Sequence, residues 1–107
     1  MLRRALFLAA ALGLATGAAQ AQSNNPDFRV NNGTGQVINE VYVSSSNVNS
    51  WGPDRLGANV LSPGQSLMVS LPAGQCVNDI RVVFATGAAM ERRGVNTCAL
   101  TDFNVTP

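Results

Sequence analysis

Val37-Ile38-Asn39-Glu40-Val41-Tyr42-Val43, at residues 37–43, carries the strongest strand signal of this chain. Five of these seven side chains are β-branched or aromatic, and such side chains suit the pleated, half-buried surface of a sheet. We therefore expect a β-strand over residues 36–44. Alternation along it predicts one face made of Val37, Asn39, Val41 and Val43, and an opposite face made of Ile38, Glu40 and Tyr42.

Shorter segments with a two-residue period lie on either side of this strand. They are found at residues 28–31, 65–71, 79–85 and 89–93, and a last extended segment covers residues 95–105. Clusters of Asn, Gly, Ser and Pro separate them and mark turns. About six or seven short strands, with turns at roughly every 8–12 residues, predict an all-β fold. We expect a small antiparallel β-sandwich, Greek-key-like or partly open as a barrel.

The register of the hairpin between residues 79–85 and 89–93 has two solutions. A loop of two residues would place Val82 opposite Glu91, which puts a charge against a core face. A loop of three residues, with Gly87 or the residue after it in the left-handed conformation, would place Phe84 opposite Met90. We expect the second solution because it pairs apolar with apolar side chains.

The first 21 residues have the three parts of a secretory signal peptide. Two arginines at positions 3 and 4 precede an apolar run, and Ala19-Gln20-Ala21 fits a cleavage site. The run is too short and too rich in small residues for a membrane anchor. The arginine pair is compatible with either the twin-arginine or the general export route. We expect a secreted or periplasmic protein without a membrane segment once residues 1–21 are removed, with a flexible tail at 22–27 and a single domain at 28–107.

The composition excludes several classes of function. The chain has seven arginines and no lysine or histidine, so it has no imidazole base and no Schiff-base lysine. After residues 1–21 are removed, 86 residues remain, with five arginines against six carboxylates. Such a balance offers no cluster of cations for nucleic acid or an anionic membrane, and we expect neither partner.

The two cysteines, Cys76 and Cys98, are expected to pair with each other. An exported chain with two cysteines most simply forms one disulfide, and a domain this small needs the added stability. The alternative is a reactive or metal-binding thiol pair. It lacks a histidine, a third cysteine and a C-x-x-C spacing.

The irregular segment at residues 44–58 is the first candidate site. Trp51, the only tryptophan, lies there among Asn47, Asn49, Asp54 and Arg55. Trp51 could offer a stacking surface to a polar ligand such as a sugar, which the polar side chains would orient. Alternatively it folds back as a hydrophobic plug that anchors the loop. A calcium site is not expected, because the segment supplies a single carboxylate and Ca²⁺ binds six to eight oxygens.

The second candidate is Glu91-Arg92-Arg93. An arginine pair could clamp a carboxylate or phosphate, but successive strand residues point to opposite faces. We expect instead ion pairs within the domain, with Asp54, Asp79 or Asp102 as partners.

Five strings spread along the chain form one pattern: Asn31-Asn32-Gly33-Thr34-Gly35, Val41-Tyr42-Val43-Ser44, Trp51-Gly52-Pro53-Asp54 followed by Leu56-Gly57, Asp79-Ile80-Arg81-Val82-Val83-Phe84, and Glu91-Arg92-Arg93-Gly94-Val95-Asn96 followed by Cys98. The pattern resembles a family of small secreted bacterial proteins, described as hypothetical or as twin-arginine signal proteins. The resemblance spans Phe28 to about Asp102. Members of that family often carry Pro where this chain has Ser45, so that turn is expected to differ. The resemblance implies a bacterial origin, export and a β fold, and it implies no activity.

Together these features predict an exported, non-catalytic binding or structural module without a cofactor. Its partner would be a protein or a small polar ligand held by the segment at 44–58. One alternative is a small exported hydrolase that uses a pair of carboxylates, which would converge in a concave pocket. Another is a protease inhibitor that presents a protruding loop at 44–58 or 86–90.

Overall fold

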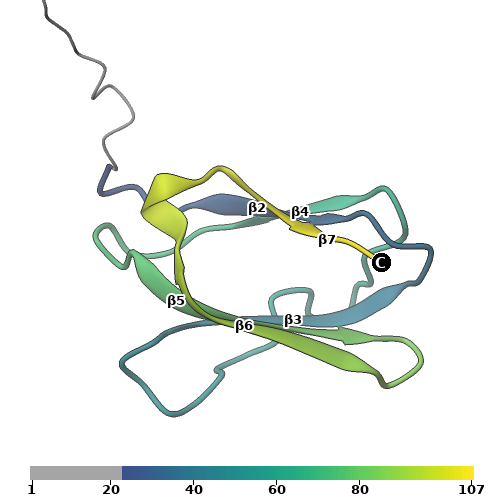
Figure 1. Cartoon of the computed structure of the whole chain (residues 1–107). Coiled ribbons are helices and arrows are strands. Elements are labelled where there is room, and N and C mark those ends of the chain that lie inside the picture. Colours follow the sequence, from purple (N-terminus) through teal and green to yellow (C-terminus); the bar gives the residue numbers. More distant parts are fainter. Residues whose placement is uncertain (1–22) are drawn as a thin grey trace, which may run out of the picture.

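The computed structural model describes residues 23–107, so the signal peptide expected at residues 1–21 lies outside the described residues. Within them, two three-stranded sheets pack face to face (Figure 1). The first sheet has the order β4 (Ser66–Val69), β2 (Phe28–Asn32), β7 (Asp102–Val105). The second has the order β3 (Ile38–Ser45), β5 (Val77–Phe84), β6 (Ala89–Asn96), and a 3-10 turn, η3 (Thr97–Ala99), follows β6. The predicted all-β sandwich is confirmed.

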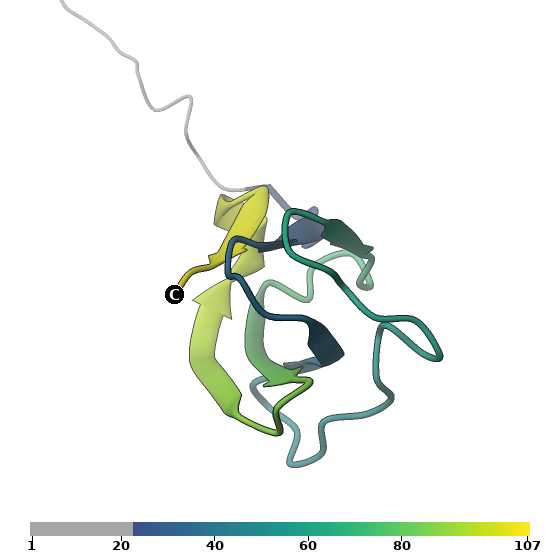
Figure 2. The ribbon, with the colours of Figure 1, turned by 90° about the vertical axis from the view of Figure 1, so that its right-hand side faces the viewer.

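Three of the four strand pairings are antiparallel, as expected. They are β2 with β4, β3 with β5, and β5 with β6. The fourth, β2 with β7, is parallel. A parallel pair requires a long connection, and here the whole second sheet lies between the two strands in the chain. Seen end-on, β6 and β7 lie on one side of the sandwich and the connection from β3 to β4 lies on the other (Figure 2).

The core lies between the sheets and draws apolar side chains from both, and from the connection between β3 and β4. Its buried members are Phe28, Val30, Ile38, Val41, Val43, Leu56, Leu61, Val69, Ile80, Val82 and Val105. Ile38 was expected on the face opposite Val41. An irregularity in the pairing of β3 with β5, between Ile38 and Glu40, shifts the alternation. The β-bulge therefore turns Ile38 onto the same inner face as Val41.

The β5–β6 hairpin has a three-residue loop, as expected, but a different register. The Phe84 amide donates to the Ala88 carbonyl at 2.8 Å, and the Gly87 amide donates to the Phe84 carbonyl at 2.8 Å. Gly87 has a φ of 92°, the left-handed conformation expected for it. Because pairing begins at Phe84 and Ala88, Met90 lies opposite Val82. The expectation of Phe84 opposite Met90 is wrong, although Met90 still meets an apolar partner.

Cys76 and Cys98 form the expected disulfide, with an S–S distance of 2.06 Å. Cys76 precedes β5, and Cys98 lies in η3, through which the chain crosses from the second sheet to the first. The Thr97 amide also donates to the Cys76 carbonyl at 2.8 Å. The bridge therefore ties the crossover to the start of β5.

The N-terminal segment differs from the flexible tail expected at residues 22–27. Pro26 is buried, and the Asn24 carbonyl accepts a hydrogen bond of 2.8 Å from the Gly74 amide. The Asp27 carboxylate accepts one of 2.9 Å from the Leu71 amide. Residues 24–27 are thus attached to the turn that follows β4, because that turn presents backbone donors that need partners.

A close approach of two backbones makes Gly33 a sensitive position. Its amide donates to the Val105 carbonyl at 2.8 Å, and a Cβ added at Gly33 would lie 2.9 Å from that oxygen. We expect Gly33→Ala to lower the free energy of unfolding by about 1–3 kcal/mol, because the backbone must shift. Gly35→Ala is the matched control, since a Cβ there meets nothing within 4 Å. Urea unfolding with equal midpoints for the two variants would contradict this expectation.

Candidate ligand-binding site

The first part of the connection that follows β3 lies on the outer face of the second sheet (Figure 1). Trp51, near its middle, packs against Tyr42 of β3, with the ring centroids 6.5 Å apart. The Arg93 guanidinium, from β6, lies 4.9 Å from the centroid of the Trp51 ring. Trp51 is partly buried and does not belong to the core between the sheets. The residue therefore anchors its loop from outside the sandwich and keeps part of its ring accessible.

A hollow of about 170 Å³ lies between this loop and the sheet. Its walls carry hydroxyl, amide, charged and aromatic groups. They belong to Ser44, Ser46, Val48, Asn49, Ser50, Trp51, Asp79 and Arg93. The loop and all three strands of the second sheet, β3 through Ser44, β5 through Asp79 and β6 through Arg93, therefore contribute to one small, polar site.

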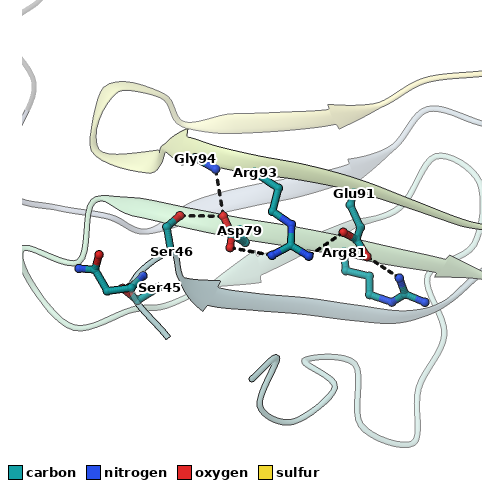
Figure 3. A network of polar contacts seen from close by, with 8 residues as sticks. Ser45, Ser46, Asp79, Arg81, Glu91, Arg93 and Gly94 are labelled. Atoms are coloured by element: carbon teal, nitrogen blue, oxygen red, sulfur yellow. Dashed lines mark hydrogen bonds and ion pairs between the residues drawn. The ribbon is translucent and has the colours of Figure 1, made fainter. Parts of the chain in front are cut away.

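Asp79 forms the floor of this site and is 5% exposed. Its Oδ1 accepts hydrogen bonds from the Ser46 hydroxyl at 2.7 Å and from the Gly94 amide at 3.0 Å (Figure 3). Its Oδ2 accepts one from Arg93 Nη1 at 3.2 Å. The hydrogen bond from Ser46, followed by that from Gly94, holds the pKa of the Asp79 carboxyl below its usual value. Asp79 is therefore an ionised carboxylate that joins the start of the loop to β6.

A chain of ion pairs continues from Asp79 along the outer face of the sheet (Figure 3). Arg93 Nη2 donates to Glu91 at 2.9 Å, and Arg81 Nη1 donates to the same carboxylate at 2.6 Å. These bonds, with that of Arg93 first, lower the pKa of Glu91. The pKa of Arg93 is raised by its hydrogen bond to Glu91. Two arginines thus balance two carboxylates, and the cluster carries no net charge.

The expectation of ion pairs within the domain is confirmed for Arg93, which pairs with Asp79. Arg92 behaves differently. It lies opposite Ile80 on the other face of β6, and its Nη1 donates to the carbonyl of its neighbour Glu91 at 3.2 Å. Among residues 23–107, Arg92 forms no ion pair with a carboxylate. The two arginines therefore lie on opposite faces of β6, as the alternation of a strand predicts.

The five candidates from the sequence separate in the structure. Trp51 and Asn49 line the hollow, and Asn47 is exposed beside it. Asp54 instead accepts hydrogen bonds of 2.9 Å from the amides of Val41 and Leu56, so its carboxylate shapes the loop. Arg55 lies on the other side of the loop, where its guanidinium donates to the Ser70 and Val43 carbonyls.

The sequence placed Arg93 in a separate second candidate, with Asp79 as one of its expected ion-pair partners, and gave Ser46 no role of its own; the structure brings all three into the hollow beside Trp51. Asp79 and Arg93 are brought together by the β5–β6 pairing, and Ser46 reaches Asp79 because β3 pairs with β5. One partial indication of where the site lies was present in the sequence, because alternation predicted Tyr42 on the face of the strand opposite Val41 and Val43. That face carries the site.

The outer face of the first sheet offers a contrast. Arg29 pairs with Asp102 at 2.9 Å, and Asn31 Nδ2 donates to the same carboxylate at 3.0 Å. The bond from Arg29, followed by that from Asn31, lowers the pKa of Asp102 to about 2. These residues connect β2 with β7 and line none of the hollows described for residues 23–107.

Models of known protein families, curated proteins and solved structures were compared with the chain, and none of them matches it. No relative therefore supplies a function. Among residues 23–107, no helix is long and apolar enough to span a membrane.

Proposed function

We propose that the protein is an exported, non-catalytic binding module that takes a small, uncharged polar ligand, such as a sugar, in the hollow beside Trp51. The observation that carries this proposal is a partly accessible indole held next to a polar hollow. Sites of this kind combine an aromatic surface with a few polar groups that orient the ligand.

The charge balance of the site supports an uncharged ligand. Asp79 and Glu91 are paired with Arg93 and Arg81, so a charged ligand would have to compete with these bonds. A ligand with hydroxyl groups can exchange hydrogen bonds with the serine and asparagine side chains without breaking an ion pair. The cluster also holds the walls in place before the ligand arrives, which lowers the cost of ordering them on binding.

The protonation state of the carboxylates supports binding over hydrolysis. A hydrolase that uses a carboxylate pair needs one of the two as a protonated acid. Asp79 and Glu91 both have a lowered pKa and bind the same guanidinium. Export is supported by the disulfide, which persists in oxidising compartments, and by the signal peptide expected at residues 1–21.

Trp51 reports on its own site, because the chain has one tryptophan. We expect its fluorescence to change in a saturable way with at least one member of a panel of glucose, galactose, N-acetylglucosamine and their disaccharides. Asn49→Ala should weaken the binding of that sugar by about five- to ten-fold, which corresponds to one lost hydrogen bond. Asn47→Ala, two residues away and outside the hollow, should leave binding unchanged.

Three results would contradict the proposal. One is a free-protein emission that is blue-shifted and resistant to acrylamide, because the indole would then be inaccessible. Another is a panel in which no sugar changes the emission. The last is an equal loss of binding in Asn49→Ala and Asn47→Ala, measured by calorimetry.

A further inference from the structure

A second hollow, of about 450 Å³, lies on the other side of the same connection. It is lined by Arg55, Leu56, Asn59, Val60, Leu61, Gln65, Ser66 and Leu67. Most of these residues belong to the connection that closes the side of the sandwich between two edge strands, β3 and β4, and Ser66 and Leu67 belong to β4 itself. The volume falls within the range of roughly 300–1,000 Å³ that is usual for small-molecule sites.

Arg55 supplies the positive charge of this hollow. Its Nη1 donates to the Ser70 carbonyl at 3.2 Å and its Nη2 donates to the Val43 carbonyl at 3.3 Å, so the side chain spans the two sheets. Its Nε is buried and has no hydrogen-bond partner. Within residues 23–107, the ion pairs of the structure do not include Arg55.

Within the part of the chain that the structure describes, the Arg55 guanidinium lacks the carboxylate partner and the full set of hydrogen bonds that a partly buried arginine normally has. Arginine keeps its charge at every pH of interest and carries five N–H donors, of which two are used here. A partly buried cation that meets only neutral carbonyls, with one buried donor unpaired, is unfavourable. A carboxylate placed against the accessible part of the guanidinium would supply the counter-charge, and carboxylate and guanidinium match in geometry.

Two of the polar side chains beside Arg55 are already engaged. Gln65 Oε1 accepts from the Ser62 amide at 2.8 Å, and the Ser66 hydroxyl donates to Asn31 at 2.5 Å. Asn59 also lines the hollow, and apolar side chains supply the rest of the wall: Leu56 and Leu61 are buried, and Val60 is 49% exposed. The hollow thus joins one cation, without an ion pair among the described residues, to a wall that is partly polar and partly apolar, and the apolar part continues into the core through Leu56 and Leu61.

We infer that this hollow binds a small amphipathic carboxylate, whose acid group pairs with Arg55 and whose apolar body lies against Leu56, Val60 and Leu61. The ligand class is an organic acid with an aliphatic or aromatic body, such as a medium-chain fatty acid. The site is separate from the hollow beside Trp51. It takes an amphipathic anion, whereas the hollow beside Trp51 takes an uncharged, polar ligand. The connection from β3 to β4 therefore carries a binding surface on each of its two sides.

The test is a titration followed by the backbone amide signals in nuclear magnetic resonance, with octanoate, octanamide and acetate as the three probes. Octanoate is expected to shift the signals of residues 55–67 in a saturable way. Octanamide, which has the same chain without the charge, should bind about ten- to hundred-fold more weakly. Acetate, which has the charge without the chain, should also bind at least ten-fold more weakly, because it buries little apolar surface.

Substitutions at exposed valines test the site without altering the fold. Val60→Asp places a carboxylate at the rim, where it repels the ligand or occupies Arg55, and should weaken octanoate binding by about ten-fold. Val77→Asp is the matched control, because Val77 is 50% exposed on β5 and outside the hollow. It should leave binding unchanged.

The inference is overturned if octanoate gives no saturable shifts at millimolar concentration, or if its shifts fall on residues 44–51. It is also overturned if octanamide binds as tightly as octanoate, or if Val60→Asp and Val77→Asp have the same effect. Sugar binding beside Trp51 should be unchanged in Val60→Asp, so the two sites can fail independently.

Discussion

Removing the Cys76–Cys98 disulfide is expected to lower the free energy of unfolding by about 3 kcal/mol. The two cysteines are 22 residues apart, and closing a loop of this length restricts the unfolded chain by about that amount. Domains of this size are stable by roughly 5–15 kcal/mol, so the loss is a large share of the total. Since each kcal/mol shifts the midpoint by about 4–8 °C in a domain of this length, we expect Tm to fall by roughly 12–24 °C.

Thermal unfolding with and without a reductant measures this effect directly. The double variant Cys76→Ser/Cys98→Ser should unfold near the temperature of the reduced protein and should not respond to reductant. A reduced protein that keeps the midpoint of the oxidised one would show that the bridge adds nothing to stability. In that case β7 and the crossover through η3 are held by packing and hydrogen bonds alone.

Phe28→Ala is expected to lower the free energy of unfolding by about 3–5 kcal/mol. Phe28 lies on β2, the central strand of the first sheet, and is 1% exposed. Its removal costs the transfer energy of the ring and leaves a cavity that neighbouring strands cannot collapse into, because both sheets are held by backbone pairing. Urea unfolding should therefore show a lower midpoint with an unchanged slope.

Met68→Ala is the matched control for Phe28→Ala. Met68 lies on β4, the neighbouring strand of the same sheet, but its side chain is 60% exposed. A surface substitution of this kind changes stability by within about 0.5 kcal/mol. If both variants lost the same stability, the two faces of the first sheet would have been assigned wrongly.

Local patterns were enough to locate the strands. A half-buried strand alternates in polarity whatever it pairs with, so the segments around Phe28, Val41, Val69 and Ile80 could be found from the order of their residues. The cysteine pairing followed in the same way, because an exported chain with two cysteines leaves few alternatives. The irregular loop that carries Trp51 and Asn49 was also located, from the absence of any regular period around them.

Local patterns failed where a residue's position depends on a distant segment. The bulge that moves Ile38 to the inner face is a feature of the pairing between β3 and β5. The register of the β5–β6 hairpin depends on which residues the turn at Gly87 pairs first, here Phe84 and Ala88. Arg55 was grouped with Trp51 because the two are four residues apart in the chain. The loop turns between them, so that Trp51 meets the outer face of a sheet and Arg55 spans the open side of the sandwich.

The order of the amino acids alone therefore specified a two-layer β protein with one disulfide and a polar loop carrying a single tryptophan, because polarity period, turn residues and cysteine count are properties of neighbouring residues. Pairing between distant strands then determined which polar groups form a site. Asp79 receives its partners from the start of the loop after β3 and from β6, and Arg93 reaches the Trp51 ring across the same sheet. Such contacts depend on the tertiary structure. The residues next to a carboxylate in the sequence do not determine which hydroxyl or guanidinium from another strand will lie beside it.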